Sequence, residues 1–129
     1  MQRITRALWL IMLASVISGC SIGQASAGDQ WLGRTETGVA SYYADRYVDR
    51  HTASGELYQS SEMTAAHRTM PFGSLVRVTN IKNGRSVVVR VNDRGPFVRG
   101  RIIDLSRAAF DSIGNTSQGL LQVRIEVIQ

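Results

Sequence analysis

The chain has 129 residues, which suits one domain and leaves no room for two domains with separate cores. Its 15 basic and 10 acidic side chains give a formal charge of +5. One cysteine excludes an intramolecular disulfide, and two histidines, His51 and His67, match no zinc-binding spacing. We therefore expect one domain without a metal or any other cofactor.

The first 19 residues have the pattern of a secretory signal. Arg3 and Arg6 precede a nearly continuous apolar run at 7–17, which is too short to span a membrane comfortably. The small residues before Cys20 resemble a bacterial lipobox, in which the signal is cut before the cysteine and the cysteine carries lipid. The alternative is an ordinary secretory signal with a chance cysteine. We predict a signal peptide at 1–19, lipidation of Cys20 and a periplasm-facing anchor, with Ser21 favouring the outer membrane.

Export changes the charge and the expected partners. Removal of residues 1–19 leaves 13 basic and 10 acidic side chains, a formal charge of +3. Export argues against nucleic acid, so an anionic cell-wall or lipid surface is the expected partner. Residues 20–37 are rich in Gly, Ser, Thr and Gln and are predicted to be a flexible tether. Residues 38–129 are predicted to be the folded domain.

Six short strands are predicted in this domain, at 39–43, 63–66, 75–80, 86–92, 101–104 and 121–128. The segments 75–80 and 121–128 alternate apolar and polar residues, as half-buried strands do. The consecutive valines in 86–92 predict burial on both faces. Asn83-Gly84 predicts a hairpin, because both residues tolerate positive φ.

The other segments are predicted to be one helix and loops. Ser106 is the expected N-cap of a helix at 107–113 that Gly114 ends. Residues 45–61 are polar and predict a long loop, and Gly95-Pro96 ends the valine-rich strand. Parallel βαβ repeats are absent, and closure of a sheet removes its exposed edges. A mainly β fold, a small closed barrel, is therefore expected.

Three polar segments stand at borders between loops and predicted strands: 52–56 (TASGE), 64–67 (TAAH) and 92–96 (NDRGP). Each alone has a structural explanation, with Glu56 as a solvated charge, His67 as a hydrogen-bonded histidine and Asp93 as a turn aspartate. The sequence has no G-x-S-x-G elbow and no glycine-rich phosphate loop. Together, two carboxylates and a histidine suit protonation of a glycosidic oxygen.

Long segments resemble one known family. GVASYYADRYVDRHTASGE, MTAAHRTMPFGSLVRVTNIKNGRSVVVRVNDRGPF and RIIDLSRAAFDSIG closely resemble the rare lipoprotein A family, over about residues 38–128. The resemblance implies a six-stranded double-psi β-barrel with one or two short helices. It also implies a septal ring lytic transglycosylase. Such enzymes cleave the β-1,4 bond between N-acetylmuramic acid and N-acetylglucosamine in peptidoglycan, and the muramic 6-hydroxyl closes a 1,6-anhydro ring.

The family's motif residues match Asp93, Glu56 and His67 of this sequence. The resemblance implies Asp93 as the general acid/base. We expect Glu56 to supply a nearby negative charge and His67 to orient one of these carboxylates. Arg94 is expected to point away from Asp93, toward Asp104, because an adjacent cation lowers the pKa of a carboxyl group. The predicted substrate contacts are Tyr42, Tyr43, Ser54, Tyr58, Asn92 and Arg94.

Several alternatives stay open. The tyrosines either stack on sugar rings or pack within the barrel. Ala44 and Asp49 stand where the family commonly has glycine, which puts the substrate preference of that loop in doubt. The barrel could instead bind glycan without cleaving it, as expansin and barwin domains do, or serve as a lipoprotein scaffold. The expected form is a monomer that contacts peptidoglycan strands and the membrane, the latter through lipid on Cys20.

Overall fold

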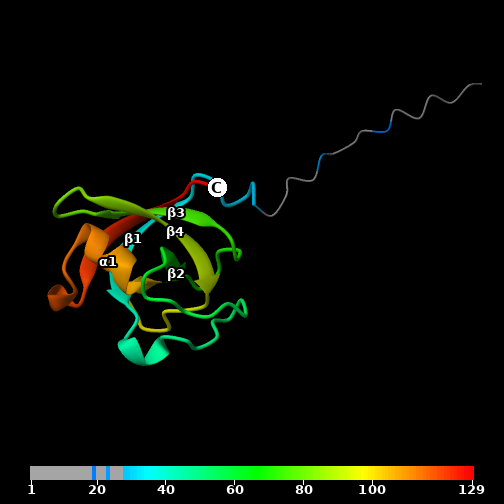
Figure 1. The fold of residues 1–129 in the computed structure, drawn as a ribbon. Coiled ribbons are helices and arrows are strands. Elements are labelled where there is room, and N and C mark those ends of the chain that lie inside the picture. Colours follow the sequence, from blue (N-terminus) through cyan, green and yellow to red (C-terminus); the bar gives the residue numbers. More distant parts are fainter. Residues whose placement is uncertain (1–18, 20–22, 24–27) are drawn as a thin grey trace, which may run out of the picture.

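A computed structural model describes residues 19, 23 and 28–129; Cys20 and the predicted signal peptide lie outside these residues. Six strands close into a barrel in the order β1-β5-β2-β4-β3-β6 (Figure 1). The strands are β1 (Thr35–Tyr42), β2 (Thr64–Ala66), β3 (Leu75–Asn80), β4 (Ser86–Asp93), β5 (Arg101–Leu105) and β6 (Leu121–Val127). The described segments also contain helix α1 (Arg107–Ile113) and the 3-10 turns η1 (Asp45–Tyr47) and η2 (Thr116–Gln118). None of these helices is long and apolar enough to span a bilayer. The predicted mainly β barrel is confirmed.

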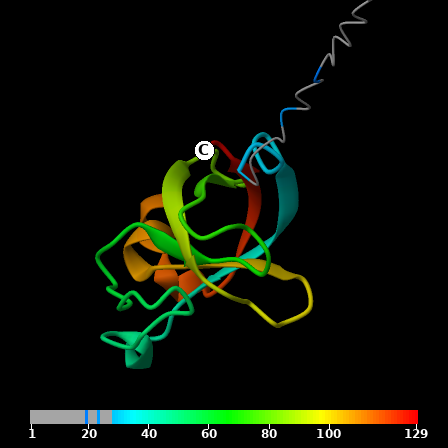
Figure 2. The same ribbon diagram turned by 90° about the vertical axis from the view of Figure 1, so that its right-hand side faces the viewer.

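The folded unit begins earlier than the predicted boundary at residue 38. Thr35 already pairs with Glu126 of β6, and the backbone N–H of Gly33 donates to the carbonyl of Val127 at 2.8 Å. The half-buried Trp31 packs against the core. Figure 2 shows this first turn beside the C-terminal end of β6. The outer residues of β1 are exposed and polar, so their membership of a strand leaves no apolar signal in the sequence.

Helix α1 and strand β6 supply much of the core, and both follow the predicted pattern. Ser106 caps the helix, because its side-chain oxygen accepts a hydrogen bond from the Ala109 N–H at 3.2 Å. Phe110 of α1 is fully buried. The alternate β6 residues Leu121, Val123, Ile125 and Val127 are buried as well. Removal of these apolar side chains from water is the main force that closes the barrel over α1.

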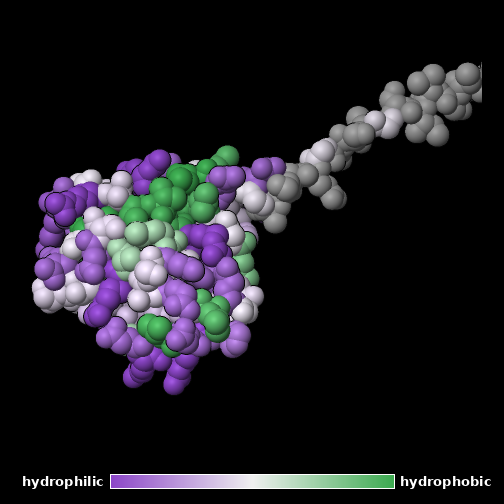
Figure 3. Space-filling model, viewed as in Figure 1, coloured by the Kyte–Doolittle hydropathy of each residue, from purple (hydrophilic) through white to green (hydrophobic). Residues whose placement is uncertain are grey.

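The valine-rich strand β4 differs from the prediction. Only Val89 and Val91 of its valines are buried, while Val88 is 41% exposed. The hairpin predicted at Asn83-Gly84 is confirmed, since β3 and β4 pair antiparallel and Gly84 has φ +73°. This hairpin keeps one face toward water, and Figure 3 shows an apolar surface area over β3 and β4. A run of valines therefore did not distinguish a strand buried on one face from one buried on both.

Candidate active site

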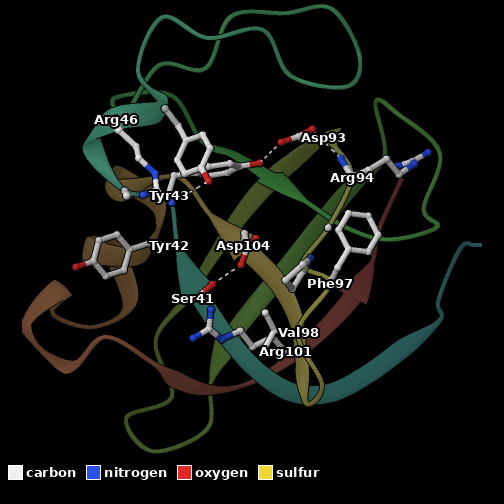
Figure 4. Close-up of a pocket in the computed structure, with 14 residues that line it drawn as sticks. Ser41, Tyr42, Tyr43, Arg46, Asp93, Arg94, Phe97, Val98, Arg101 and Asp104 are labelled. Atoms are coloured by element: carbon white, nitrogen blue, oxygen red, sulfur yellow. Dashed lines mark hydrogen bonds between the residues drawn. The ribbon is translucent and has the colours of Figure 1, made fainter.

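An open cavity of about 350 Å³ lies where β1, β4 and β5 end and their loops begin (Figure 4). Its lining residues are Ser41, Tyr42, Tyr43, Ala44, Arg46, Tyr47, Asp93, Arg94, Gly95, Pro96, Phe97, Val98, Arg101 and Asp104. The cavity contains two carboxyl groups, those of Asp93 and Asp104. It is a concave site with convergent polar groups, of the kind in which small ligands bind.

The barrel topology explains why these carboxyl groups share one cavity. Strand β1 runs parallel to β5 and pairs Ser41 with Asp104, while β2 runs parallel to β4 and pairs Ala66 with Asp93. Ala66 also pairs with Asp104 across the antiparallel β2–β5 ladder. The four residues thus form one row across adjacent strands, where opposed side chains share a face. The small buried Ala66 separates the two aspartates by two strand spacings, about 10 Å between backbones.

Asp93 accepts hydrogen bonds from three groups of the described chain. The Tyr43 hydroxyl donates to Oδ2 at 2.5 Å, and the backbone N–H groups of Ala53 and Arg94 donate to Oδ1 at 2.8 and 2.9 Å. Burial, followed by this contact with Asp93, raises the pKa of Tyr43 far above its ordinary value. Tyr43 therefore stays protonated and remains a donor. Both oxygens of the Asp93 carboxylate are held in fixed positions.

The side chain of Arg94 points away from Asp93, as predicted, but the predicted partner Asp104 is wrong. Its Nη1 donates to the carbonyl of Met70 at 2.9 Å and to that of His67 at 3.3 Å. Its guanidinium also lies over the ring of Phe72, 4.0 Å from the centroid. These contacts with the loop after β2 hold the guanidinium of Arg94 away from the Asp93 carboxylate.

Asp104 is the second carboxyl group of the cavity and comes from the middle of an apolar strand. Burial raises the pKa of Asp104, and the negative charge of Asp93 raises it further. The hydrogen bond from the Ser41 hydroxyl and the positive charge of Arg101 act in the opposite direction. Figure 4 shows Asp104 near the middle of the cavity, with Asp93 above it and Arg101 below it. A half-buried carboxyl group with a raised pKa retains its proton more readily than a solvated one.

Glu56 does not line this cavity. Its Oε2 forms an ion pair with Nη1 of Arg90 at 2.7 Å, and its side chain is 43% exposed. The contact with Arg90 lowers the pKa of Glu56. Arg90 on β4 therefore holds the Glu56 carboxylate outside the cavity lining, and an effect of its charge on Asp93 stays a prediction. The loop still reaches the site, since Ala53 donates to Asp93.

His67 is buried and also lies outside the cavity lining. Its Nδ1 accepts hydrogen bonds from the backbone N–H groups of Thr69 and Met70, both at 3.1 Å, so its ring hydrogen lies on Nε2. Nε2 contacts Oε2 of Glu36 at 2.7 Å. The carboxylate that His67 contacts is thus Glu36, and neither Asp93 nor Glu56. His67 instead holds the loop whose carbonyls bind Arg94.

The predicted substrate contacts separate into two groups. Tyr42, Tyr43 and Arg94 line the cavity, whereas Ser54, Tyr58 and Asn92 do not. Tyr58 is 2% exposed, its ring stacks on Tyr43 with centroids 4.5 Å apart, and its hydroxyl accepts from the Arg107 N–H. Tyr58 therefore acts on the cavity only by supporting Tyr43.

The sequence pointed to Tyr42, Tyr43, Asp93 and Arg94 among the lining residues but to none of the others with functional side chains, which are Asp104, Ser41, Arg46, Tyr47, Phe97 and Arg101. Phe97 follows the NDRGP segment and is 80% exposed, an unusual position for an aromatic ring. Its place directly after that motif was an available signal. The described residues contain no group of three or more metal-ligating side chains.

A family model described as lytic transglycolase matches residues 35–125, which is most of the chain. The chain belongs to this family. The endolytic peptidoglycan transglycosylase RlpA of Pasteurella multocida is 54% identical over 114 residues, covering 88% of the chain and 38% of the relative. The RlpA of Vibrio cholerae is 56% identical over 96 residues, covering 74% and 36%. The chain thus spans less than two fifths of the length of these relatives, and the predicted resemblance is confirmed.

Solved structures agree on the fold. The Streptomyces papain inhibitor superposes with a TM-score of 0.63 at 27% identity, covering 76% of this chain and 97% of the inhibitor. An expansin of Clavibacter michiganensis superposes with a TM-score of 0.59 at 21% identity, covering 74% and 51%. The barrel is a double-psi β-barrel, as predicted. At this identity the expansin supports the fold and no activity.

Proposed function

We propose that this chain is an endolytic peptidoglycan lytic transglycosylase, which cleaves the bond between N-acetylmuramic acid and N-acetylglucosamine and leaves 1,6-anhydro ends. The observation that carries the proposal is the open cavity in which Asp93 and Asp104 face the same space. The relatives named endolytic peptidoglycan transglycosylase RlpA support it, because their similarity spans this barrel. General acid–base chemistry on a glycosidic bond requires such positioned carboxyl groups.

The reaction needs one proton given and one proton taken. The glycosidic C1–O bond breaks as the leaving oxygen receives a proton, and a new C1–O6 bond forms as the muramic 6-hydroxyl loses one. The family resemblance assigns both transfers to Asp93. In our proposal Asp93, which accepts three hydrogen bonds, takes the hydroxyl proton. Asp104, whose pKa burial raises, donates to the leaving oxygen, and solvent in the open cavity later returns the proton from Asp93 to Asp104.

Aromatic walls suit a sugar polymer in this cavity. Phe97 and Tyr42 line the cavity on opposite sides, and the ring of Tyr42 points away from the two carboxyl groups (Figure 4). Sugar rings have apolar faces that pack on aromatic side chains, while their hydroxyls bond to polar groups. Glu56 and His67 support the loops that carry the donors to Asp93 and the carbonyls that bind Arg94. In this proposal they are positioning residues.

The location follows from the same proposal. An enzyme that acts on peptidoglycan belongs to the bacterial cell envelope, and the sequence predicts lipid on Cys20 facing the periplasm. We propose the outer membrane as the anchoring surface, a short tether before the barrel, and a monomer as the active form. The partner is the glycan strand of peptidoglycan.

The substitution Asp93→Asn tests the activity. It should reduce the release of anhydro-muropeptides from purified sacculi by about 100-fold or more, since a positioned acid or base contributes about 10²–10⁴-fold. Asp111→Asn, on the exposed side of α1, makes the same chemical change away from the cavity and should leave release intact. Thermal unfolding of both variants controls for folding. Undiminished release by Asp93→Asn would remove this residue from the reaction, and glycan binding by the wild type without any anhydro ends would favour a binding barrel.

A further inference from the structure

A second cavity continues from the first one, away from Asp93. It has a volume of about 480 Å³ and shares Ser41, Tyr42, Ala44 and Arg101 with the first. Its other lining residues are Asp45, Arg107, Gly119 and Leu120. Shared walls make the two cavities one groove, and Arg101 stands at their junction. A groove of this length can hold substrate beyond the sugar at the two aspartates.

The guanidinium of Arg101 has no hydrogen-bond or ion-pair partner among residues 28–129. It lies half-buried beside the Ser41–Asp104 pair, and its charge lowers the pKa of Asp104 without a direct contact (Figure 4). Among the described residues, Asp45 is the only carboxylate that lines the second cavity, and Arg107 already holds it at 3.1 Å. An unpaired guanidinium inside a groove has five donors available for an incoming acceptor.

Two further arginines border the same groove. Arg46 contacts the hydroxyl of Tyr47 at 3.2 Å and lies over its ring, and it has no carboxylate partner within the described chain. Arg107 contributes its positive charge to the second cavity, since its Nη1 pairs with Asp45 and its Nε is buried. The groove therefore offers more cationic donors than its own carboxylates use. Guanidinium groups bind carboxylates through paired hydrogen bonds, which lysine cannot match.

We propose that Arg101, with Arg46 and Arg107 on the walls of the same groove, forms a subsite for a carboxylate carried by the glycan substrate. This inference rests on the proposed function, because the muramic sugar carries a lactyl group whose carboxylate is either free or joined to a peptide. The free lactyl carboxylate and the carboxylates of an attached peptide share this chemistry. N-acetylglucosamine is neutral, so the subsite would fix which sugar stands next to Asp93 and Asp104. The arginines thereby set the register of the strand.

A competing role for Arg101 is to lower the pKa of Asp104 without contacting the substrate. That role predicts a changed rate with no change in which glycan binds. The subsite predicts that binding itself depends on the substrate carboxylate. Binding measured without turnover therefore separates the two roles, and it also separates the subsite from the proposed enzyme activity.

The experiment measures binding by calorimetry in the Asp93→Asn background, in which turnover is expected to fall by about 100-fold or more. The probes are a tetrasaccharide of alternating N-acetylmuramic acid and N-acetylglucosamine units with free lactyl carboxylates, the same glycan with these groups as methyl amides, and the same glycan bearing peptides. We expect an anionic glycan to bind about tenfold more tightly than the methyl amide. Arg101→Gln should remove this preference. Arg85→Gln, an exposed arginine of the β3–β4 hairpin, should keep it.

The outcomes decide the inference. A preference for the free lactyl form identifies that carboxylate as the ligand, and a preference for the peptide-bearing form alone identifies the peptide. Equal binding of the neutral and anionic glycans, or a preference that survives Arg101→Gln, would overturn the subsite. A preference that depends on Arg101 in a protein that never releases anhydro ends would keep the subsite and reject the proposed activity.

Discussion

The hydroxyl of Tyr43 is the group whose removal tests the arrangement of the site most directly. Both backbone donors reach Oδ1 of Asp93, whereas Tyr43 donates to Oδ2 at 2.5 Å. Tyr43→Phe keeps the ring that stacks on Tyr58 and deletes only this hydrogen bond. Without it the carboxylate can rotate about its Cβ–Cγ bond, so the oxygen that takes the substrate proton is no longer held.

The expected loss of activity follows from the strength of that hydrogen bond. A hydrogen bond to a charged group contributes about 1.5–3 kcal/mol. At 1.4 kcal/mol for each factor of ten, this range equals about 10-fold to 150-fold in rate. Asp93 keeps its two backbone donors and the cavity is open to water, which favours the lower half. We therefore expect kcat to fall by about 10–30-fold with little change in KM.

The assay is the rate of anhydro-muropeptide release from sacculi, quantified by mass spectrometry over a range of sacculus concentrations. Tyr58→Phe is the matched control, because it deletes a hydroxyl from the other ring of the same stack, one that accepts from the Arg107 N–H rather than contacting Asp93. In urea, Tyr43→Phe should lose about 1.5–3 kcal/mol of unfolding free energy and Tyr58→Phe about 1 kcal/mol. Only Tyr43→Phe should lose activity beyond about threefold. If the two variants lose activity equally, the Tyr43 hydroxyl does not position Asp93 for the reaction.

Three other substitutions have defined outcomes. Burial raises the pKa of Asp104, so the folded chain binds this proton more tightly than the unfolded chain, and the stability of the wild type falls as pH rises through the folded pKa. As pH rises from 3 to 7, the stability of Asp104→Asn in urea unfolding should therefore increase relative to that of the wild type. A stability difference that does not change with pH would contradict this. Arg90 lowers the pKa of Glu56, so their ion pair stabilises the fold at pH values above the ordinary pKa of glutamate, and this stabilisation is lost as pH falls through the folded pKa. Glu56→Gln should lower the unfolding free energy by less than about 1 kcal/mol at pH 7, because the pair is exposed, and should not change it at pH 2.5. Phe110→Ala should cost about 3–5 kcal/mol, since this ring is fully buried in the core, and a melting temperature near the wild-type value would show that the helix is not integral to the barrel.

Features that depend on neighbours in the sequence were predictable. The Ser106 cap, the alternation of β6 and the Asn83-Gly84 hairpin are local, because a few adjacent residues determine the backbone they favour. The double-psi barrel and the choice of Asp93 were predicted from the resemblance of whole segments to one family. The polar start of β1 was missed because its strand pairing uses backbone atoms and leaves its side chains in water.

The partners of the charged residues depended on the tertiary structure. Glu56 pairs with Arg90 and His67 contacts Glu36, each across more than 30 residues of chain. Asp93 shares its cavity with Asp104 because two parallel strand pairs in a closed barrel bring their carboxyl ends to one rim. The sequence by itself determined which residues could carry charge and which segments could be strands. Strand order, a property of long-range backbone pairing and core burial, decided which of these charges meet.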